Sequence, residues 1–100
     1  MIAAIVPAAG RSRRMGNPKL LLEHEGRPIL DRVIDALRQG GVDLVVAVVP
    51  PDTEPEGPSL AEVAHRAGAH VIAPAIRPAE MRESIEIGLA ALTERVQASP

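Results

Sequence analysis

Residues 8–19 read AAGRSRRMGNPK and follow directly on a short apolar run from Ile2 to Val6. The run is apolar at successive positions, which indicates a strand covered on both faces of a parallel sheet. The turn after it is built from Ala8, Ala9 and Gly10, which carry little or no side chain, so a ligand can approach the backbone closely. A strand that leads into such a turn favours an α/β fold with a binding site beyond the strand's carboxyl end.

The second half of this stretch is strongly basic. It carries four cations and no acid, and the cations are Arg11, Arg13, Arg14 and Lys19. Such a cluster suits a polyphosphate, because arginine grips phosphate oxygens in a fork and lysine supplies a point charge. The P-loop motif does not match, since five residues separate Gly10 from Gly16, and the dinucleotide glycine motif fails because Arg11-Ser12 follows Gly10. A solvated basic surface loop is the alternative interpretation.

The rest of the chain alternates between helical and strand patterns. The expected elements are a turn at Glu25-Gly26, a helix from Pro28 to the Gly40-Gly41 pair, a strand from Leu44 to Val49, a helix from Ser59 to Gly68, a strand from His70 to Ala73 and a helix from Glu80 to about Val96. Alternation of this kind predicts an α/β fold, a three-layer Rossmann-like parallel sheet with helices on both faces and right-handed crossovers.

Several local features sharpen this expectation. Pro7 should end the pairing of the first strand, because proline cannot donate to a ladder. Leu20 to Glu23 should be a short extended or turn segment. Ser59 with Glu62 three residues later has the pattern of a capping box that opens a helix. Gly88 lies inside the last helix, where close helix packing is the simplest explanation. The apolar stripe expected on that helix consists of Met81, Ile85, Leu89, Leu92 and Val96.

Composition excludes several classes of function. The chain has 100 residues, enough for one small domain, with 46% hydrophobic residues, no aromatic residue and no cysteine. The missing aromatics and a net charge of −2 argue against nucleic-acid binding. No apolar run is long enough to span a membrane, and we expect a cytoplasmic protein without membrane contact. The three histidines, at positions 24, 65 and 70, do not have the spacing of one metal-ligand set. Asp52, Glu54 and Glu56 lie near a strand end, where they could approach a metal, but a solvated acidic loop is the favoured interpretation.

At residues 8–19 the pattern Ala-Ala-Gly-x-Ser-x-Arg-Met-Gly-x-Pro-Lys resembles the signature loop of nucleotidyltransferases similar to molybdenum-cofactor cytidylyltransferase. A second segment, residues 81–89, is similar to another family segment, which has a serine, two variable residues, and then a small residue or glycine followed by leucine. The resemblance implies transfer of an NMP from an NTP to a phosphorylated small-molecule acceptor with release of pyrophosphate. Ala8-Ala9, in place of a glycine pair, resembles the cytidylyl branch and favours CTP.

The resemblance also implies roles for single residues. Arg14 and Lys19 would hold the triphosphate as the catalytic pair, with Lys19 closest to the developing charge. Ser84 would lie near the base or ribose. The nucleotide-binding set implied by the family is Ala8, Ala9, Gly10, Arg11, Ser12, Arg14, Lys19 and Ser84. Many relatives carry small residues where this chain has Arg82-Glu83, a departure that bears on base specificity.

The resemblance covers the whole chain but only about the first half of such an enzyme, so we expect residues 1–100 to be the N-terminal nucleotide-binding part of a longer domain. Mg²⁺ would be the cofactor, with its ligand aspartate beyond residue 100, and no metal ligand is assigned within the chain. We also expect an exposed sheet edge and self-association through it. A non-catalytic nucleotide-binding module and a purely structural domain remain alternatives. Molybdopterin, a sugar phosphate and an isoprenoid precursor all remain open as acceptors.

Overall fold

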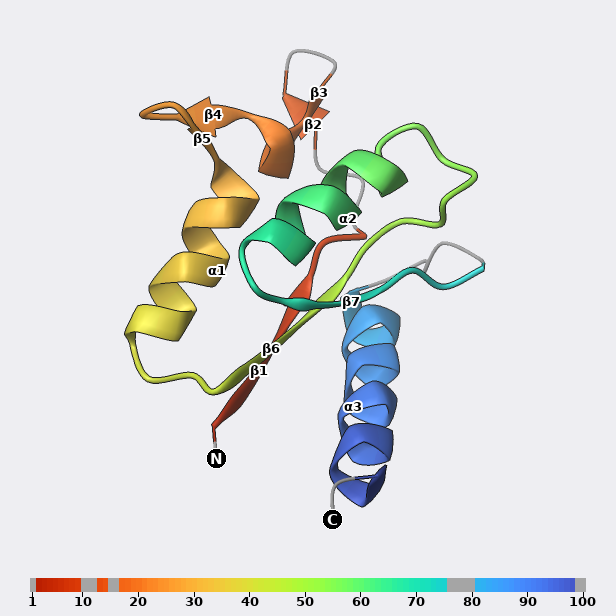
Figure 1. Ribbon diagram of the computed structural model, residues 1–100. Coiled ribbons are helices and arrows are strands. Elements are labelled where there is room, and N and C mark those ends of the chain that lie inside the picture. The colour runs from red at the N-terminus through yellow and green to blue at the C-terminus, as the bar shows by residue number, and fades with distance from the viewer. Residues whose placement is uncertain (1, 10–12, 15–16, 76–80, 99–100) are drawn as a thin grey trace.

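The computed structural model describes residues 2–9, 13–14, 17–75 and 81–98. Its elements are β1 (Ala3–Pro7), β2 (Arg13–Arg14), β3 (Asn17–Pro18), the 3-10 helix η1 (Lys19–Leu21), β4 (Glu23–His24), β5 (Arg27–Pro28), α1 (Ile29–Gln39), β6 (Leu44–Val48), α2 (Gly57–Arg66), β7 (His70–Ile72) and α3 (Met81–Ala98) (Figure 1). None of the helices in the described part of the chain has the length and apolar content that crossing a bilayer requires.

Three parallel strands form the main sheet, in the order β1-β6-β7. Ala3 pairs with Leu44 and Pro7 with Val48 at the two ends of the β1–β6 ladder, and Val46 pairs with His70 at the start of β7. The central strand β6 is buried from Val45 onward. It reads as an unbroken apolar run because strands flank it on both sides and helices cover both of its faces.

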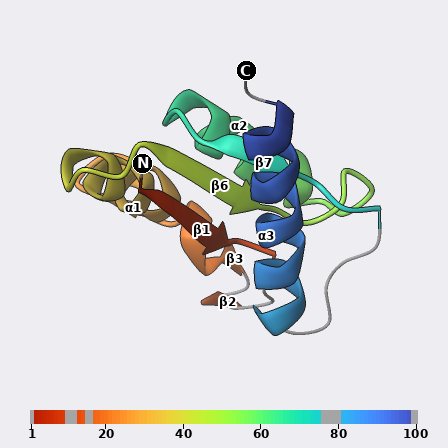
Figure 2. The same cartoon turned by 90° about the horizontal axis from the view of Figure 1, so that it is seen from below.

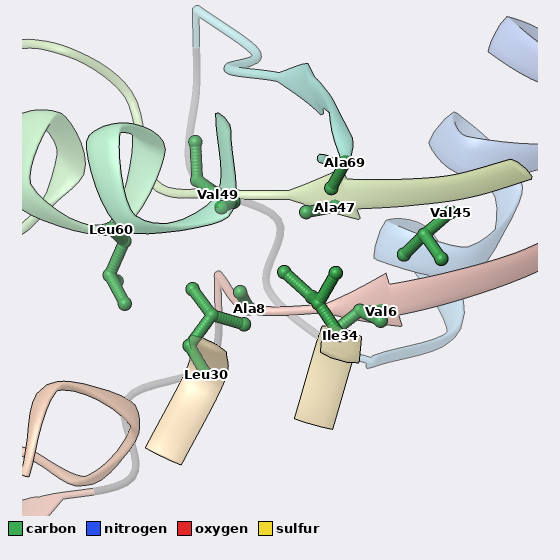
Figure 3. Close-up of a cluster of buried hydrophobic side chains, with 10 residues drawn as sticks. Val6, Ala8, Leu30, Ile34, Val45, Ala47, Val49, Leu60 and Ala69 are labelled. Carbon is green, nitrogen blue, oxygen red and sulfur yellow. The ribbon is translucent and has the colours of Figure 1, made fainter. Parts of the chain in front are cut away.

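Helices α1 and α2 pack on one face of this sheet and α3 packs on the other, so the expected three-layer α/β architecture is confirmed (Figure 2). Side chains alternate along β1 accordingly. Val6 and Ala8 join Leu30 and Ile34 of α1 in the buried core (Figure 3), whereas Ile5 faces Gly88 of α3.

Pro7 is the last residue of β1 and pairs with Val48 at the end of the ladder, so the expectation that it ends the pairing is confirmed. The Ala8 N–H donates to the Val48 carbonyl at 2.7 Å and closes this last pair. At the other end, the Ile2 carbonyl accepts the N–H of Leu44 at 3.2 Å. Backbone groups of alternate residues point to opposite sides of a strand, so the even-numbered residues of β1 bond to β6 and the Pro7 nitrogen faces the free edge, where no donor is needed.

Helix α2 begins earlier than the capping-box pattern predicted. Glu56 occupies the N-cap position and the helix starts at Gly57, which leaves Ser59 inside the first turn, where it cannot act as the cap. A Cβ on Gly57 would lie 2.9 Å from the Pro50 carbonyl oxygen, so only glycine lets the chain turn this closely. Pro58 then presets a helical φ at the next position.

The segment before α1 is more structured than predicted. Lys19–Leu21 forms a 3-10 helix, and β4 and β5 form a short hairpin around Glu25 (φ 55°) and Gly26 (φ 80°). The turn at Glu25-Gly26 is therefore confirmed, with both residues in the left-handed region, as in hairpin turns. Pro28 is the N-cap of α1 instead of its first residue, and Gly41 (φ 103°) follows the end of the helix as predicted.

The last helix lies close to its predicted limits, but Ile85 and Leu89 of the predicted apolar stripe do not face the sheet. The side chains of Met81 and Val96 lie outside the described residues. Ser84, with 3% of its surface exposed, and Gly88 point to the sheet, while Ile85 and Leu89 remain 38% and 52% exposed. A Cβ on Gly88 would lie 2.6 Å from Cγ2 of Ile5, so the helix approaches β1 through its smallest side chains. The expectation that Gly88 serves close packing is confirmed.

Candidate nucleotide site

The carboxyl ends of the parallel strands lie at one edge of the sheet, and the segments that leave them gather there (Figure 1). From β1 the chain passes through Ala8 and Ala9 into the basic stretch. From β6 it passes through Pro50 and Pro51 into the loop that opens α2. From β7 it leads toward the start of α3. This is the edge where parallel α/β sheets bind their ligands.

Ala8 and Ala9 are buried, with 2% and 1% of their surfaces exposed, and the side chain of Ala8 belongs to the hydrophobic core. Small residues are therefore required here by packing as well as by any ligand. The Ala8 N–H also bonds to the Val48 carbonyl, so the first residue of this turn is held against the sheet. Gly10, Arg11 and Ser12 lie outside the described residues.

The basic stretch folds into a small hairpin. Arg13 pairs with Pro18 and Arg14 with Asn17 in an antiparallel ladder between β2 and β3. Lys19 follows at once as the first residue of η1, and its carbonyl accepts the Leu22 N–H at 3.2 Å. The hairpin and η1 thus hold the backbone of three of the four basic residues, Arg13, Arg14 and Lys19.

Lys19 combines an exposed side chain with a fixed backbone. The next two residues of η1, Leu20 and Leu21, pack against the hydrophobic core. η1 also lies against both α1 and α2. A cation on such a segment can meet phosphate without first ordering its own backbone, which lowers the entropic cost of binding.

Ser84 approaches the site from the other face of the sheet. Gly88 lies over Ile5, and Ser84 is one helical turn, about 6 Å, nearer the carboxyl edge because α3 runs antiparallel to the strands. Its neighbour Arg82 is exposed and pairs with Glu86 at 3.3 Å. The departure from the family pattern at Arg82-Glu83 therefore falls on the solvent side of the helix, away from Ser84.

The start of α2 contains one important residue that motif reasoning did not single out. Gly57 packs against the carbonyl oxygens of Pro50 and Pro51, which binds the loop tightly to the start of α2. The Glu54 N–H donates to the Pro51 carbonyl at 2.9 Å and completes a turn within it. Pro58 was the available sequence signal, since proline is favoured in the first turn of a helix.

The described residues do not form a metal site by themselves. Within the part of the chain that the structure describes, no three His, Cys, Asp or Glu side chains are close enough to share an ion. The three histidines lie on β4, α2 and β7. Asp52 is exposed, whereas Glu56 is buried to 8% exposure beside the start of α2.

Comparison with known families agrees with this arrangement. The model of the MobA-like NTP transferase domain matches residues 4–99. The chain belongs to this family. Because the match runs through β1, the basic hairpin and α3, the segments gathered at the carboxyl edge all lie within the family domain.

Individual relatives are nucleotidyltransferases of two kinds. The chain is 39% identical over 94 residues to 2-C-methyl-D-erythritol 4-phosphate cytidylyltransferase of Streptomyces avermitilis, a match that covers 90% of this chain and 37% of the relative. It is 40% identical over 76 residues to molybdenum cofactor guanylyltransferase of Xanthomonas euvesicatoria, covering 65% of this chain and 40% of the relative. The MobA-like domain described here thus spans well under half the length of these relatives.

Proposed function

We propose that this chain is the nucleotide-binding part of a nucleotidyltransferase that transfers an NMP, with CMP preferred, from an NTP to a phosphorylated small-molecule acceptor. The observation that carries the proposal is the position of the basic hairpin and η1. They follow the first strand directly, at the carboxyl edge of the sheet, in a chain that belongs to the MobA-like family. An anchored cation at that edge suits the triphosphate of a nucleotide.

The proposed reaction needs positioning and charge neutralisation more than covalent help. A phosphate oxygen of the acceptor attacks the α-phosphorus, the bond from that phosphorus to the bridging oxygen breaks, and pyrophosphate leaves with the bonding electron pair. Negative charge therefore grows on the leaving group. We assign Lys19 and Arg14 to that charge, because fixed cations there stabilise the transition state more than the ground state.

The rest of the proposed site recognises the nucleoside. The backbone at Ala8, Ala9 and Gly10 would face the base and phosphates, with Arg11 and Ser12 beside them. Ser84 would contact the base or ribose from α3. Two features favour CMP. The turn after β1 carries Ala8-Ala9 in place of a glycine pair, and the Streptomyces avermitilis relative is named a cytidylyltransferase. Mg²⁺ would accompany the triphosphate as its counter-ion.

Calorimetric titration of the chain with Mg-CTP and Mg-GTP tests this proposal. We expect saturable binding of Mg-CTP, tighter than that of Mg-GTP. Lys19→Ala should lose about 1.5–3 kcal/mol of binding free energy, as expected for a charge-assisted contact. Arg11→Ala should lose less, since Arg11 matches a variable position of the family pattern.

Arg66→Ala is the matched control for charge. Arg66 is an exposed cation on α2 that pairs with Glu62 at 3.1 Å, so its loss changes net charge equally without touching the proposed site. Absence of saturable binding by either nucleotide would contradict the proposal. Equal losses from Lys19→Ala and Arg66→Ala would show that binding senses net charge alone.

A further inference from the structure

Two backbone hydrogen bonds at the base of the β4–β5 hairpin connect Lys19 to the start of α1 (Figure 1). The Leu22 N–H donates to the Lys19 carbonyl at 3.2 Å and closes η1. The Leu22 carbonyl accepts the N–H of Ile29, the first residue of α1, at 2.9 Å. The backbone of Leu22 therefore joins the turn that carries Lys19 directly to the helix.

Both the helix start and η1 depend on this contact. The N-cap of α1 is Pro28, which makes no side-chain cap hydrogen bond. The first N–H groups of a helix have no partner within it, so the Leu22 carbonyl satisfies one of these donors in place of a capping side chain. η1 is a single 3-10 turn with poor hydrogen-bond geometry, and a contact from outside helps to hold it closed.

Ion pairs of both polarities clamp the hairpin on α1. Arg27 of β5 donates from Nε to Asp31 Oδ2 at 2.8 Å, and its Nη2 lies 3.6 Å from Asp35 Oδ2. At the hairpin turn the polarity is reversed, because Glu25 Oε2 accepts from Nη1 of Arg32 at 3.4 Å. Charge pairs of opposite polarity in one hairpin favour a single position of that hairpin on the helix.

We propose that Arg27 is a positioning residue for Lys19, acting through the hairpin and Leu22, an inference that rests on the proposed function. Leu20 and Leu21 hold one side of η1 against the core, and the clamped hairpin holds its end. With both sides held, the side chain of Lys19 meets the triphosphate from a fixed backbone and loses less freedom on binding. Loss of the clamp lowers the fraction of molecules that present this side chain correctly.

Calorimetric titration with Mg-CTP and NMR hydrogen exchange of the Leu22 amide test this proposal. Arg27→Met and Asp31→Asn break the same ion pair but change net charge in opposite directions. We expect each variant to raise the Kd of Mg-CTP about two- to threefold. Each should also speed exchange of the Leu22 amide about three- to fivefold, within the range of a partly exposed ion pair. The double variant should differ little from the single variants, since the pair is lost in each.

Arg66→Met and Glu62→Gln are the matched controls. They break an exposed ion pair on α2, and both should leave the Leu22 amide exchanging at the wild-type rate. Net charge acting alone would weaken Mg-CTP binding in Arg27→Met and tighten it in Asp31→Asn, because the nucleotide is an anion. Such opposite shifts would overturn the proposal.

Wild-type exchange of the Leu22 amide in both Arg27→Met and Asp31→Asn would also overturn it. A wild-type chain that binds neither Mg-CTP nor Mg-GTP would instead contradict the proposed function. The exchange rates, which are measured without nucleotide, would still decide in that case whether the clamp holds η1.

Discussion

At Gly88, a substitution by alanine has two opposing effects on stability, a gain in helix propensity and a steric clash with Ile5, and their free energies can be compared. Replacing glycine by alanine inside a helix ordinarily stabilises it by about 1 kcal/mol. Here the new methyl would meet three side-chain atoms of Ile5, the nearest at 2.6 Å, and overpacking of this kind costs about 1–3 kcal/mol. We therefore expect Gly88→Ala to lower the free energy of unfolding, as measured by urea denaturation.

A double-mutant cycle separates the two effects at this contact. If the clash with Ile5 is the cause, Gly88→Ala combined with Ile5→Ala should be less destabilised than the sum of the two single variants. Ala90→Gly, at an exposed position of the same helix, supplies the helix-propensity effect alone. Strict additivity in the cycle would mean that α3 does not lie on β1 through Gly88.

At the scale of elements, the hairpin before α1 is tied to the helix by an ion pair. Arg27 Nε of β5 donates to Asp31 Oδ2 of α1 at 2.8 Å, and Arg27 also lies 3.6 Å from Asp35. The hydrogen bond from Arg27 holds the pKa of the Asp31 carboxyl below its usual value. Both side chains are partly exposed, so the pair anchors the hairpin at a modest gain in stability.

The pH dependence of stability follows from the direction of this shift. A carboxyl whose pKa is lower in the folded state stabilises the fold above its unfolded pKa and loses that contribution as pH falls through the folded pKa. We therefore expect wild type to be more stable than Asp31→Asn at neutral pH and the difference to vanish in the acid range below about pH 4. Thermal melting of both proteins across pH is the measurement.

Glu62→Gln is the comparison for this pair, since Glu62 forms an exposed ion pair on α2 with a longer contact of 3.1 Å to Arg66. It should show a smaller difference from wild type over the same pH range. An Asp31→Asn variant that matches wild type at every pH would mean that Arg27 and Asp31 do not interact in solution.

At the scale of the whole molecule, we expect nucleotide binding without turnover. In the described part of the chain no three metal-ligating side chains lie together, and we expect Lys19, Arg14 and backbone donors to oppose most of the triphosphate charge. Pyrophosphate release from Mg-CTP with a panel of phosphorylated acceptors is the assay, run beside the binding titration. The positive control is 2-C-methyl-D-erythritol 4-phosphate cytidylyltransferase of Streptomyces avermitilis, assayed with 2-C-methyl-D-erythritol 4-phosphate as acceptor. Release at a comparable rate by this chain would refute the expectation.

The sequence by itself determined the order and the approximate limits of the main elements. The run at Leu44 to Val49, the glycines after α1 and α2, and the helical spacing beyond residue 80 each act through local backbone preferences or periodicity, which need no knowledge of neighbours. The basic stretch at residues 8–19 could likewise be recognised as a candidate site, because its charges are adjacent in the chain.

Only the tertiary structure decided which side of each element meets a neighbour. Periodicity predicted an apolar stripe on α3, but the helix packs through Ser84 and Gly88 because Ile5 leaves room only for small side chains. Pro7 stays within β1 because its nitrogen happens to face the free edge. Such outcomes depend on the fit between surfaces far apart in the chain, and that fit exists only once the sheet and its helices have assembled.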